Sequence, residues 1–544
     1  MKAKKKYFNR KIHIILLLLI IVIAAVFRLW QLQITPPGLY PDEAMNGNDA
    51  IETLATGEFK TFYPENNGRE GLYIWLLSFS FKIFEPSPWS LRLVSAILGI
   101  LTILGLYLLT KEIFYRTKTN SKNKINQIAL LSSFFMAISF WHINFSRIGF
   151  RAILMVFLIC FAFYFLLRAF RKNSALNYIL AGLFFGLGFY SYLAFRLVVL
   201  LLGITILIQA VIYWQKRKKQ KENFRKFLKI AFLNHGWWKI GLLFLSILIA
   251  VLPLIITFVN NPEYLISRTG NISIFAAEKP LQEFGVSIIK TAGMFHIYGD
   301  WNWRHNFAGS PLLHWTVGIL FALGFMITFK NIFSRSIKEF FTIKRSTSIF
   351  LLSWFVIMLL PSILTREGMP HALRSIGIIP IVCIYTAIGL IWIFYWLLKS
   401  NKNFAILILL FFIIYPTFAN YHKYFIKWSN NPNVSAAFRQ DLVNLTCHLN
   451  HLSKDINKYV IVNEPGVPIP YPDGVPTPAQ TIKFSAKDNI NYLKENQINQ
   501  IKTQDQAIII VPLRKNPALD QQIKNKWSDL KIIKINEFDM YEIN

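Results

Sequence analysis

The sequence predicts a mainly α-helical, polytopic membrane protein with a small C-terminal α/β domain outside the membrane. Apolar stretches of about 20 residues, the length that crosses a bilayer as a helix, recur as far as Tyr421. Lysine and arginine gather in alternate loops between these stretches, and past Tyr421 the composition turns polar. Since 54% of the 544 residues are hydrophobic, the chain does not have the composition of an ordinary soluble protein.

Eleven of the apolar stretches are predicted to span the membrane. The first is longer than the hydrophobic region of a signal peptide and lacks a small-residue cleavage site, so we expect it to stay as an N-terminal anchor. The predicted architecture is therefore a bundle of about 11 helices. The predicted spans are 12–31, 91–110, 127–144, 152–170, 176–192, 196–214, 239–259, 312–329, 348–364, 373–397 and 404–420.

The net charge of +31 is distributed as membrane topology requires. Cytoplasmic loops of membrane proteins carry an excess of lysine and arginine, and every strongly basic loop falls on that side when the N-terminus is cytoplasmic. Such loops also contact anionic lipid, so their distribution argues against a nucleic-acid partner. The basic loops are 111–124, 168–172, 215–226, 330–345 and 399–402.

The three cysteines supply neither a disulfide framework nor a thiolate metal site. Cys160 and Cys383 lie in predicted spans, whereas Cys447 stands alone in the C-terminal region. We expect all three to be small buried hydrophobic residues.

The outer segments between spans are long and polar. One stretch within the first of them, 71–84, is apolar but has only 14 residues and contains Lys82, so it is short for a span. An interfacial or re-entrant helix fits it better. The principal outer segments are 32–90, 260–311 and 365–374.

The polar C-terminal region alternates short apolar runs with segments of helical spacing, which predicts an α/β domain on the outer face. We therefore divide the chain into a transmembrane module, 1–425, and an extracytoplasmic domain, 430–544. Strands are expected at 458–464, 507–512 and 530–543, and helices at 436–452 and 518–527.

An acidic pair, Asp42 and Glu43, follows the first span directly and should emerge at the outer membrane surface. A carboxylate beside lipid is partly desolvated, which favours proton acceptance, so both are predicted as catalytic residues. The alternative is local: after Pro41, Asp42 could cap a helix whose first turn would favour Glu43. The two roles are compatible because capping uses one carboxylate oxygen.

Arg69 lies at the entry to the stretch 71–84, where a lipid phosphate would lie. A guanidinium group matches phosphate oxygens with paired donors, so Arg69 is a predicted substrate-binding residue. Equally, it could simply extend towards lipid headgroups. Glu70 beside it is a further substrate-binding candidate, and could also pair with Arg69 or bind a metal ion.

Other outer turns bring further polar side chains to the same side of the membrane. His142 is expected to be a satisfied core histidine, and Asp300 lies in the motif GDWNWRHN. The histidines could bind metal with a carboxylate, but no H-x-x-x-H spacing is present, so any metal is assigned to Asp42, Glu43 or Glu70. The remaining predicted substrate-binding residues are Arg147, Arg304, His305, His371 and Arg374.

No predicted span carries a charged residue near its middle. Ion-coupled transporters need such groups or broken helices at that depth, so the chemistry is expected at the outer surface.

Several segments resemble the membrane GT-C glycosyltransferases, in particular the protein O-mannosyltransferase and lipid A aminoarabinose transferase group known as glycosyltransferase family 39. The resemblance covers most of residues 12–400. It is carried, in the family's order, by LYPDEAMNGNDAIETLATGEF, GREGLYIWLLSFSFKIF with LRLVSAILGILTILGLYLLTKEIF, IALLSSFFMAISFWHINFSR, GDWNWRHNFAGSPLL and PHALRSIGIIP.

The resemblance implies a polyprenyl-phosphate-linked sugar donor and a reaction outside the cytoplasmic membrane. It gives the role of base to Asp42, with Glu43 as its neighbour, and contact with the donor phosphate to Arg69. Glu70 and Gly71 replace two prolines of the aminoarabinose transferases, and Gly68 replaces their zinc-ligand glutamate.

The predicted function is therefore an inverting glycosyltransferase that moves a hexosyl or pentosyl group from a polyprenyl phosphate to a protein, lipid or cell-envelope acceptor. No cofactor is specified beyond a divalent cation that the carboxylates could bind. The alternative is a non-enzymatic lipid or polysaccharide translocase, or an assembly scaffold, which would need no outer acid but a polar path through the spans.

Overall fold

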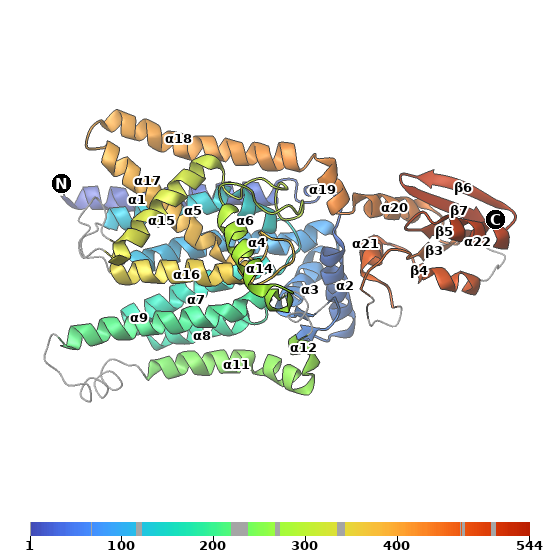
Figure 1. The fold of residues 1–544 in the computed structure, drawn as a ribbon, viewed down its shortest axis with the longest axis horizontal. Helices are drawn as coiled ribbons and strands as arrows, with labels where there is room; N and C mark the ends of the chain where they lie inside the picture. Colours follow the sequence, from blue (N-terminus) through green and yellow to red (C-terminus); the bar gives the residue numbers. More distant parts are fainter. Residues whose placement is uncertain are drawn as a thin grey trace. The chain divides into compact units, whose positions relative to one another are not determined.

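The chain forms two compact units in the computed structural model (Figure 1). One unit contains residues 1–30, 95–147 and 151–427, and the other contains residues 31–94, 148–150 and 428–544. Large parts of the predicted basic loops 111–124, 215–226 and 330–345 lie outside the described residues. The described residues are 2–66, 68–115, 122–218, 238–266, 273–333, 343–467, 469, 474–501 and 507–543.

Nine helices in the described part of the chain are long and apolar enough to cross a membrane, so the polytopic helical fold is confirmed but the count of 11 is not. Predicted spans 127–144 and 176–192 form shorter helices. The first is interrupted because Ser139 leaves the helix and caps the next one through the backbone N–H of His142. The nine helices are α1 (Lys2–Leu29), α4 (Pro88–Phe114), α7 (Ala152–Lys172), α9 (Val198–Lys218), α11 (Lys239–Asn260), α15 (Trp315–Phe333), α16 (Arg345–Ile363), α17 (Ile379–Leu397) and α18 (Lys402–Tyr421).

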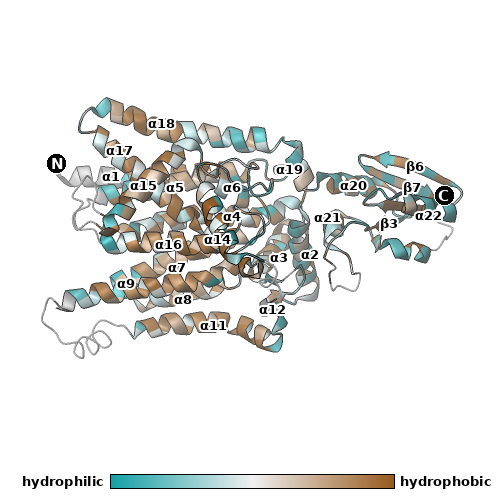
Figure 2. Cartoon of the chain, in the orientation of Figure 1, coloured by the Kyte–Doolittle hydropathy of each residue, from teal (hydrophilic) through white to brown (hydrophobic). Residues whose placement is uncertain are grey.

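Helix α17 is the most enclosed of these nine long helices. Every residue from Ile379 to Ile391 is buried, as expected for a helix that is apolar all round (Figure 2). It packs against α15, α18 and α5 (Lys122–Ile138). The two helices α15 and α17 are so close that a Cβ atom on Gly324 would collide with the carbonyl of Tyr385. A Cβ atom on Gly389 would collide with the carbonyl of Leu320. Small residues thus let two membrane helices approach backbone to backbone.

The short apolar helices are α8 (Ala175–Gly188), which packs between α7 and α11, and α3 (Leu72–Phe84). With 13 residues, α3 is about 20 Å long and too short for a bilayer core of about 30 Å, which agrees with its prediction as a non-spanning helix. In the second unit α3 packs against α2 (Pro41–Thr56). Between them the chain forms a two-stranded antiparallel ladder of β1 (Phe62–Tyr63) and β2 (Arg69–Glu70).

The C-terminal region of the second unit contains a five-stranded sheet of order β4-β3-β5-β7-β6, which confirms the predicted α/β fold. Strand β3 is parallel to β4 and β5, whereas β7 is antiparallel to β5 and β6. The predicted run 530–543 forms the β6–β7 hairpin; β4 was not predicted. The strands are β3 (Asn457–Ile461), β4 (Ile490–Leu493), β5 (Ile508–Pro512), β6 (Leu530–Ile535) and β7 (Phe538–Ile543).

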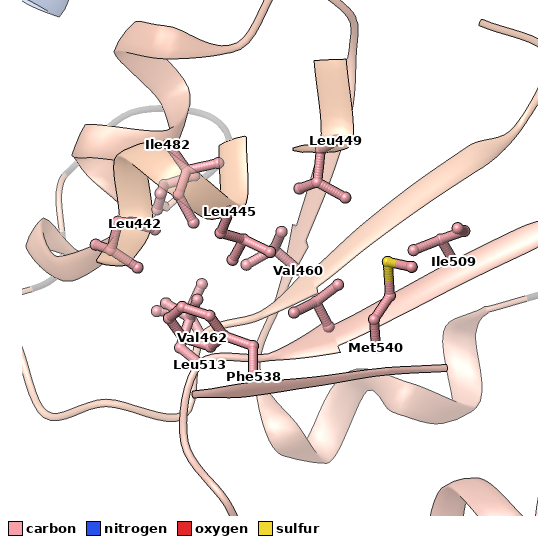
Figure 3. Close-up of a cluster of buried hydrophobic side chains, with 13 residues drawn as sticks. Leu442, Leu445, Leu449, Val460, Val462, Ile482, Ile509, Leu513, Phe538 and Met540 are labelled. Carbon is pink, nitrogen blue, oxygen red and sulfur yellow. The ribbon is translucent and has the colours of Figure 1, made fainter. Parts of the chain in front are cut away.

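Helices cover both faces of this sheet, so its central strand is apolar throughout. On β5, Ile509 and Val511 face one core and Ile508 and Ile510 the other. The first core contains side chains of α20 (Gln440–His451) and α21 (Gln480–Ser485), shown in Figure 3. The second contains those of α22 (Pro517–Lys526).

Two cysteines lie where they were expected. Cys160 and Cys383 are buried in the first unit, but Cys447 is exposed on α20, contrary to the prediction. The side of α20 that is buried is the one that carries Leu442, Leu445 and Leu449, since these residues recur at the helical period.

Candidate functional site

The acidic pair lies in the first turn of α2. Pro41 occupies the first helical position, where its fixed φ angle suits a helix, and Asp42 and Glu43 favourably face the positive end of the helix dipole. The N-terminal capping residue is Tyr40, so Asp42 does not cap the helix as the alternative interpretation supposed. Asp42 is half-buried, and its Oδ1 accepts a hydrogen bond of 2.9 Å from the Asn66 side-chain amide.

Glu43 is fully buried and forms an ion pair with Arg92, which is also fully buried. Its Oε2 lies 3.2 Å from Arg92 Nε and accepts the backbone N–H of Gly149 at 2.7 Å. Arg92 also donates to the carbonyls of Pro36 and Gly38, each at 2.7 Å. These contacts tie three separate chain segments together and favour a structural role for Glu43.

A Cβ atom on Gly149 would collide with a methyl group of Leu91, so any larger residue there would displace that side chain. Its carbonyl accepts a hydrogen bond of 3.0 Å from Asn46 of α2, while its N–H is held by Glu43. The turn 148–150 is therefore bound to α2 through both the N–H and the carbonyl of Gly149.

Arg69 is also buried, with 3% of its surface exposed, and acidic groups surround it. Its Nη1 lies 2.5 Å from Asp49 Oδ2 and donates to the Asn46 side chain at 3.1 Å. Its Nη2 lies 3.6 Å from Glu65 Oε2. Two carboxylates thus neutralise the guanidinium in the structure, so Arg69 has its charge compensated before any phosphate arrives. Glu70, paired opposite Phe62 in the β1–β2 ladder, is buried as well.

Sequence reasoning missed Asp49, Glu65 and Arg92, although the helical spacing held a signal for the first. Asp42, Asn46 and Asp49 are separated by four and three residues, which places them on one face of α2. This polar face contacts the β1–β2 segment through Asn66 and Arg69.

The burial of Asp49 predicts a pH dependence of stability. Burial raises the pKa of Asp49 from 3.8 to about 6, although Arg69 opposes that change. Because the folded state then binds the proton more tightly, stability is highest below the unfolded pKa and falls as pH rises from about 4 to about 6. Two pKa units correspond to about 3 kcal/mol. The Asp49→Asn variant has no carboxyl group to titrate and should lose this pH dependence. The free energy of unfolding is measured for both proteins between about pH 4 and about pH 6. The difference between them should change across that interval, and a constant difference would contradict the prediction.

A second polar cluster lies in the first unit, in the loop after α14 (Pro280–Gly293). The motif GDWNWRHN braces itself: Asp300 Oδ1 accepts the N–H of Asn302 at 2.8 Å, and the Asn302 side chain accepts the N–H of Arg304 at 3.0 Å. Such side-chain-to-backbone bonds are typical of turns built from aspartate and asparagine. The loop therefore presents Asp300 and His305 in a defined geometry.

The loop after α16 supplies His371 to the same cluster. The backbone N–H of Ala372 donates to Asp300 Oδ2 at 2.8 Å, and the Trp141 indole donates to the Ala372 carbonyl at 3.0 Å. Asp300 Oδ2 also accepts a 3.0 Å bond from His305 Nδ1, and His371 Nδ1 lies 3.7 Å from it. The structure thus brings together Asp300, His305 and His371, which sequence spacing alone could not join.

The surroundings of Asp300 and His371 lower the pKa of both side chains. Burial alone would raise the pKa of Asp300, but the hydrogen bond and charge of His305 lower it overall. Burial, and after it the charges of His305 and Arg374, hold the pKa of His371 well below its usual value, although Asp300 opposes them. A carboxylate therefore faces a neutral His371 imidazole.

The remaining predicted residues have separate surroundings. Arg147 is fully buried, donates to the Phe27 carbonyl at 3.1 Å and lies over the rings of Tyr424 and Phe425. Arg374 bonds to Thr365 and Glu367 within its own loop, and the Arg304 carbonyl accepts a bond from Asn144. His142 is buried as expected and its Nδ1 lies 2.7 Å from Arg28 Nη2, but within the described residues its Nε2 has no hydrogen-bond partner, so it is satisfied only in part.

The comparisons support the resemblance found in the sequence, because a family profile matches part of the chain and solved membrane-protein structures share its fold. The profile of the dolichyl-phosphate-mannose-protein mannosyltransferase family matches residues 72–256. ArnT from Cupriavidus metallidurans superimposes in its apo state with a TM-score of 0.56 at 10% identity, over 96% of this chain and 97% of that one. Its structure bound to undecaprenyl phosphate gives a TM-score of 0.54 at 11% identity, with the same coverage.

Two further matches are less extensive. The oligosaccharyltransferase of Archaeoglobus fulgidus has a TM-score of 0.52 at 15% identity and covers 90% of this chain, but the match spans only 64% of that enzyme. An uncharacterized protein of Aquifex aeolicus is 30% identical over 146 residues, which are 26% of this chain and 27% of that protein. The chain is thus a multi-pass membrane protein of this fold, and it matches only 27% of the length of the Aquifex aeolicus protein.

Proposed function

We propose that this protein is a glycosyltransferase that moves a sugar from a polyprenyl-phosphate-linked donor to an acceptor on the outer face of the cytoplasmic membrane. The observation that carries the proposal is the fold shared with ArnT over nearly the whole of both chains, because one of those ArnT structures holds undecaprenyl phosphate. The N-terminus would be cytoplasmic, and the C-terminal α/β region and the acidic pair would face outward, as the basic loops predict.

In the proposed reaction Asp42 takes the proton of the acceptor hydroxyl or amine. The acceptor atom forms a bond to the anomeric carbon as the bond from that carbon to the phosphate oxygen breaks. The polyprenyl phosphate leaves with the bonding electron pair, and a single displacement inverts the anomeric centre. Within the described residues Asp42 Oδ2 accepts no hydrogen bond, so this oxygen is available for a proton.

The leaving phosphate needs positive charge. Arg304 and Arg374 are half-buried, and Arg374 pairs at 3.1 Å with Glu367, which is exposed, whereas Arg69 is enclosed by the buried Asp49 and Glu65. These environments support Arg304 and Arg374 as phosphate ligands, and they support Arg69 as a positioning residue that orders α2 behind Asp42. Donors aimed at the developing charge act most strongly in such partly desolvated surroundings.

The test is a donor panel in sealed membrane vesicles. Right-side-out and inside-out vesicles that contain the protein are given radiolabelled polyprenyl-phosphate sugars and, in parallel, sugar nucleotides. We expect one lipid-linked sugar to pass to a membrane or protein acceptor in right-side-out vesicles above the level of vesicles without the protein. Transfer from sugar nucleotides alone, or label that crosses the bilayer while still on its lipid, would refute the proposal, the second in favour of a translocase.

A further inference from the structure

The Asp300–His305–His371 cluster is more than a clasp between two loops. The Ala372 N–H already joins the two loops at Asp300 Oδ2, and His305 Nδ1 of the same loop as Asp300 bonds to that oxygen as well. His371 Nδ1 is nevertheless directed at the same oxygen, at a distance of 3.7 Å that is too long for a hydrogen bond. Among the described residues this buried nitrogen has no hydrogen-bond partner.

Unpaired buried polar atoms are costly, so one that faces a carboxylate and a second imidazole calls for a ligand. The three residues can each offer one ligand atom, and these atoms lie within 4.8 Å of one another. In a tetrahedral zinc site with bonds of about 2.0–2.1 Å the ligand atoms are about 3.3 Å apart. The separations of 3.0 and 3.7 Å from Asp300 Oδ2 bracket that value, and the ion would replace the proton that His305 Nδ1 donates to Asp300, which is released to water.

We propose that Asp300, His305 and His371 form a binding site for a transition-metal ion of the Zn²⁺ class. Two imidazole nitrogens and one carboxylate oxygen suit such an ion rather than Mg²⁺ or Ca²⁺, which prefer oxygen ligands. Three protein ligands leave the fourth tetrahedral position to water or an anionic oxygen. The expected metal ligands Asp42, Glu43 and Glu70 form no such group within the described residues, and Glu43 is held by Arg92.

The loop that carries Asp300 and His305 is also held by bonds that do not use Asp300 Oδ2, and His371 lies in a different loop. Asp300 Oδ1 is held by the Asn302 N–H, and the Asn306 side chain donates to the carbonyls of Asp300 and Ser310. The loop should therefore keep its shape when His371 is replaced. Since the metal is measured on the resting protein, this inference stands or falls independently of the proposed transfer reaction.

The experiment uses the full chain in detergent, without a histidine tag, after treatment with a chelator. Equilibrium dialysis against Zn²⁺ alone should give one tightly bound ion per chain, and Co²⁺ should give the d–d absorption of a four-coordinate site. His371→Gln should weaken Zn²⁺ binding by at least about 10-fold, since losing even a partner of a ligand costs that much. The matched control is His296→Gln, whose Nε2 lies 3.0 Å from the Gly318 carbonyl, outside the cluster.

Zn²⁺ should also raise the unfolding temperature of the wild-type protein and of His296→Gln, but not that of His371→Gln. Equal Zn²⁺ binding by all three proteins would place the ion elsewhere and overturn the proposal. A wild-type protein that binds no Zn²⁺ and gives no four-coordinate Co²⁺ spectrum would also overturn it and leave the cluster as a clasp. The Co²⁺ spectrum needs no variant, so the test holds even if His371→Gln fails to fold.

Discussion

Replacing Asp42 with asparagine is expected to lower the rate of sugar transfer by a factor of about 10²–10⁴, the usual contribution of a general base. The amide cannot accept the acceptor's proton, but its oxygen can still accept the 2.9 Å hydrogen bond from Asn66. The first turn of α2 should therefore keep its structure. Transfer is measured in right-side-out vesicles with the donor that the panel identifies.

Glu52→Gln is the matched control for this variant. Glu52 lies on the same helix, and its side chain is 40% exposed and paired with Lys60 at 3.2 Å, so its loss should leave transfer unchanged. Both variants should reach the membrane in wild-type amounts and unfold at the wild-type temperature. An Asp42→Asn protein that turns over at the wild-type rate would remove the assignment of the base.

Breaking the buried pair of Glu43 and Arg92 is expected to cost about 3–5 kcal/mol of stability, because each single replacement leaves the other charge buried without its partner. Arg92→Met leaves Glu43 with the Gly149 N–H and no positive charge. Glu43→Gln leaves Arg92 with the carbonyls of Pro36 and Gly38. Denaturant or thermal unfolding in detergent measures the loss.

The double variant Glu43→Gln/Arg92→Met should be more stable than Arg92→Met alone, since it buries no uncompensated charge. The two single variants and the double variant together give the interaction free energy between Glu43 and Arg92. Loss of the exposed Glu52–Lys60 pair should cost only about 0–1 kcal/mol by comparison. If Glu43→Gln keeps the wild-type stability and yet stops transfer, Glu43 is a catalytic residue after all.

Features that depend on neighbouring residues could be predicted from the sequence. The acids at the start of α2 follow from local rules, as does the apolar run of α17, although α2 begins at Pro41 and not after Asp42 as the capping interpretation supposed. The 13-residue α3 was recognisable as too short to cross a bilayer because length alone decides that. Span 127–144 was overestimated because hydrophobicity continues through Ser139 although the helix does not.

The sequence could indicate which residues of the candidate site are chemically capable, but not which groups they contact, because those groups are distant along the chain. Glu43 and Arg69 were singled out as chemical groups, but their partners decide what they can do. Arg92 is 49 positions from Glu43, and Gly149 is 106 positions away. Asp300 is 72 positions from Ala372, whose N–H it accepts beside His371. No periodic pattern connects residues so far apart.

By itself, the sequence determined that this chain is a membrane helix bundle with a small α/β domain, and that acidic and basic groups gather in the polar segments between its apolar stretches. Hydrophobic length and period are local properties, so they can be read along the chain. The tertiary structure alone decided which charge neutralises which. It enclosed Glu43 and Arg69 in ion pairs, left Asp42 half-buried and turned two histidines towards one carboxylate. The physical reason is that the energy of a buried charge depends on the groups packed around it, and only folding brings those groups together.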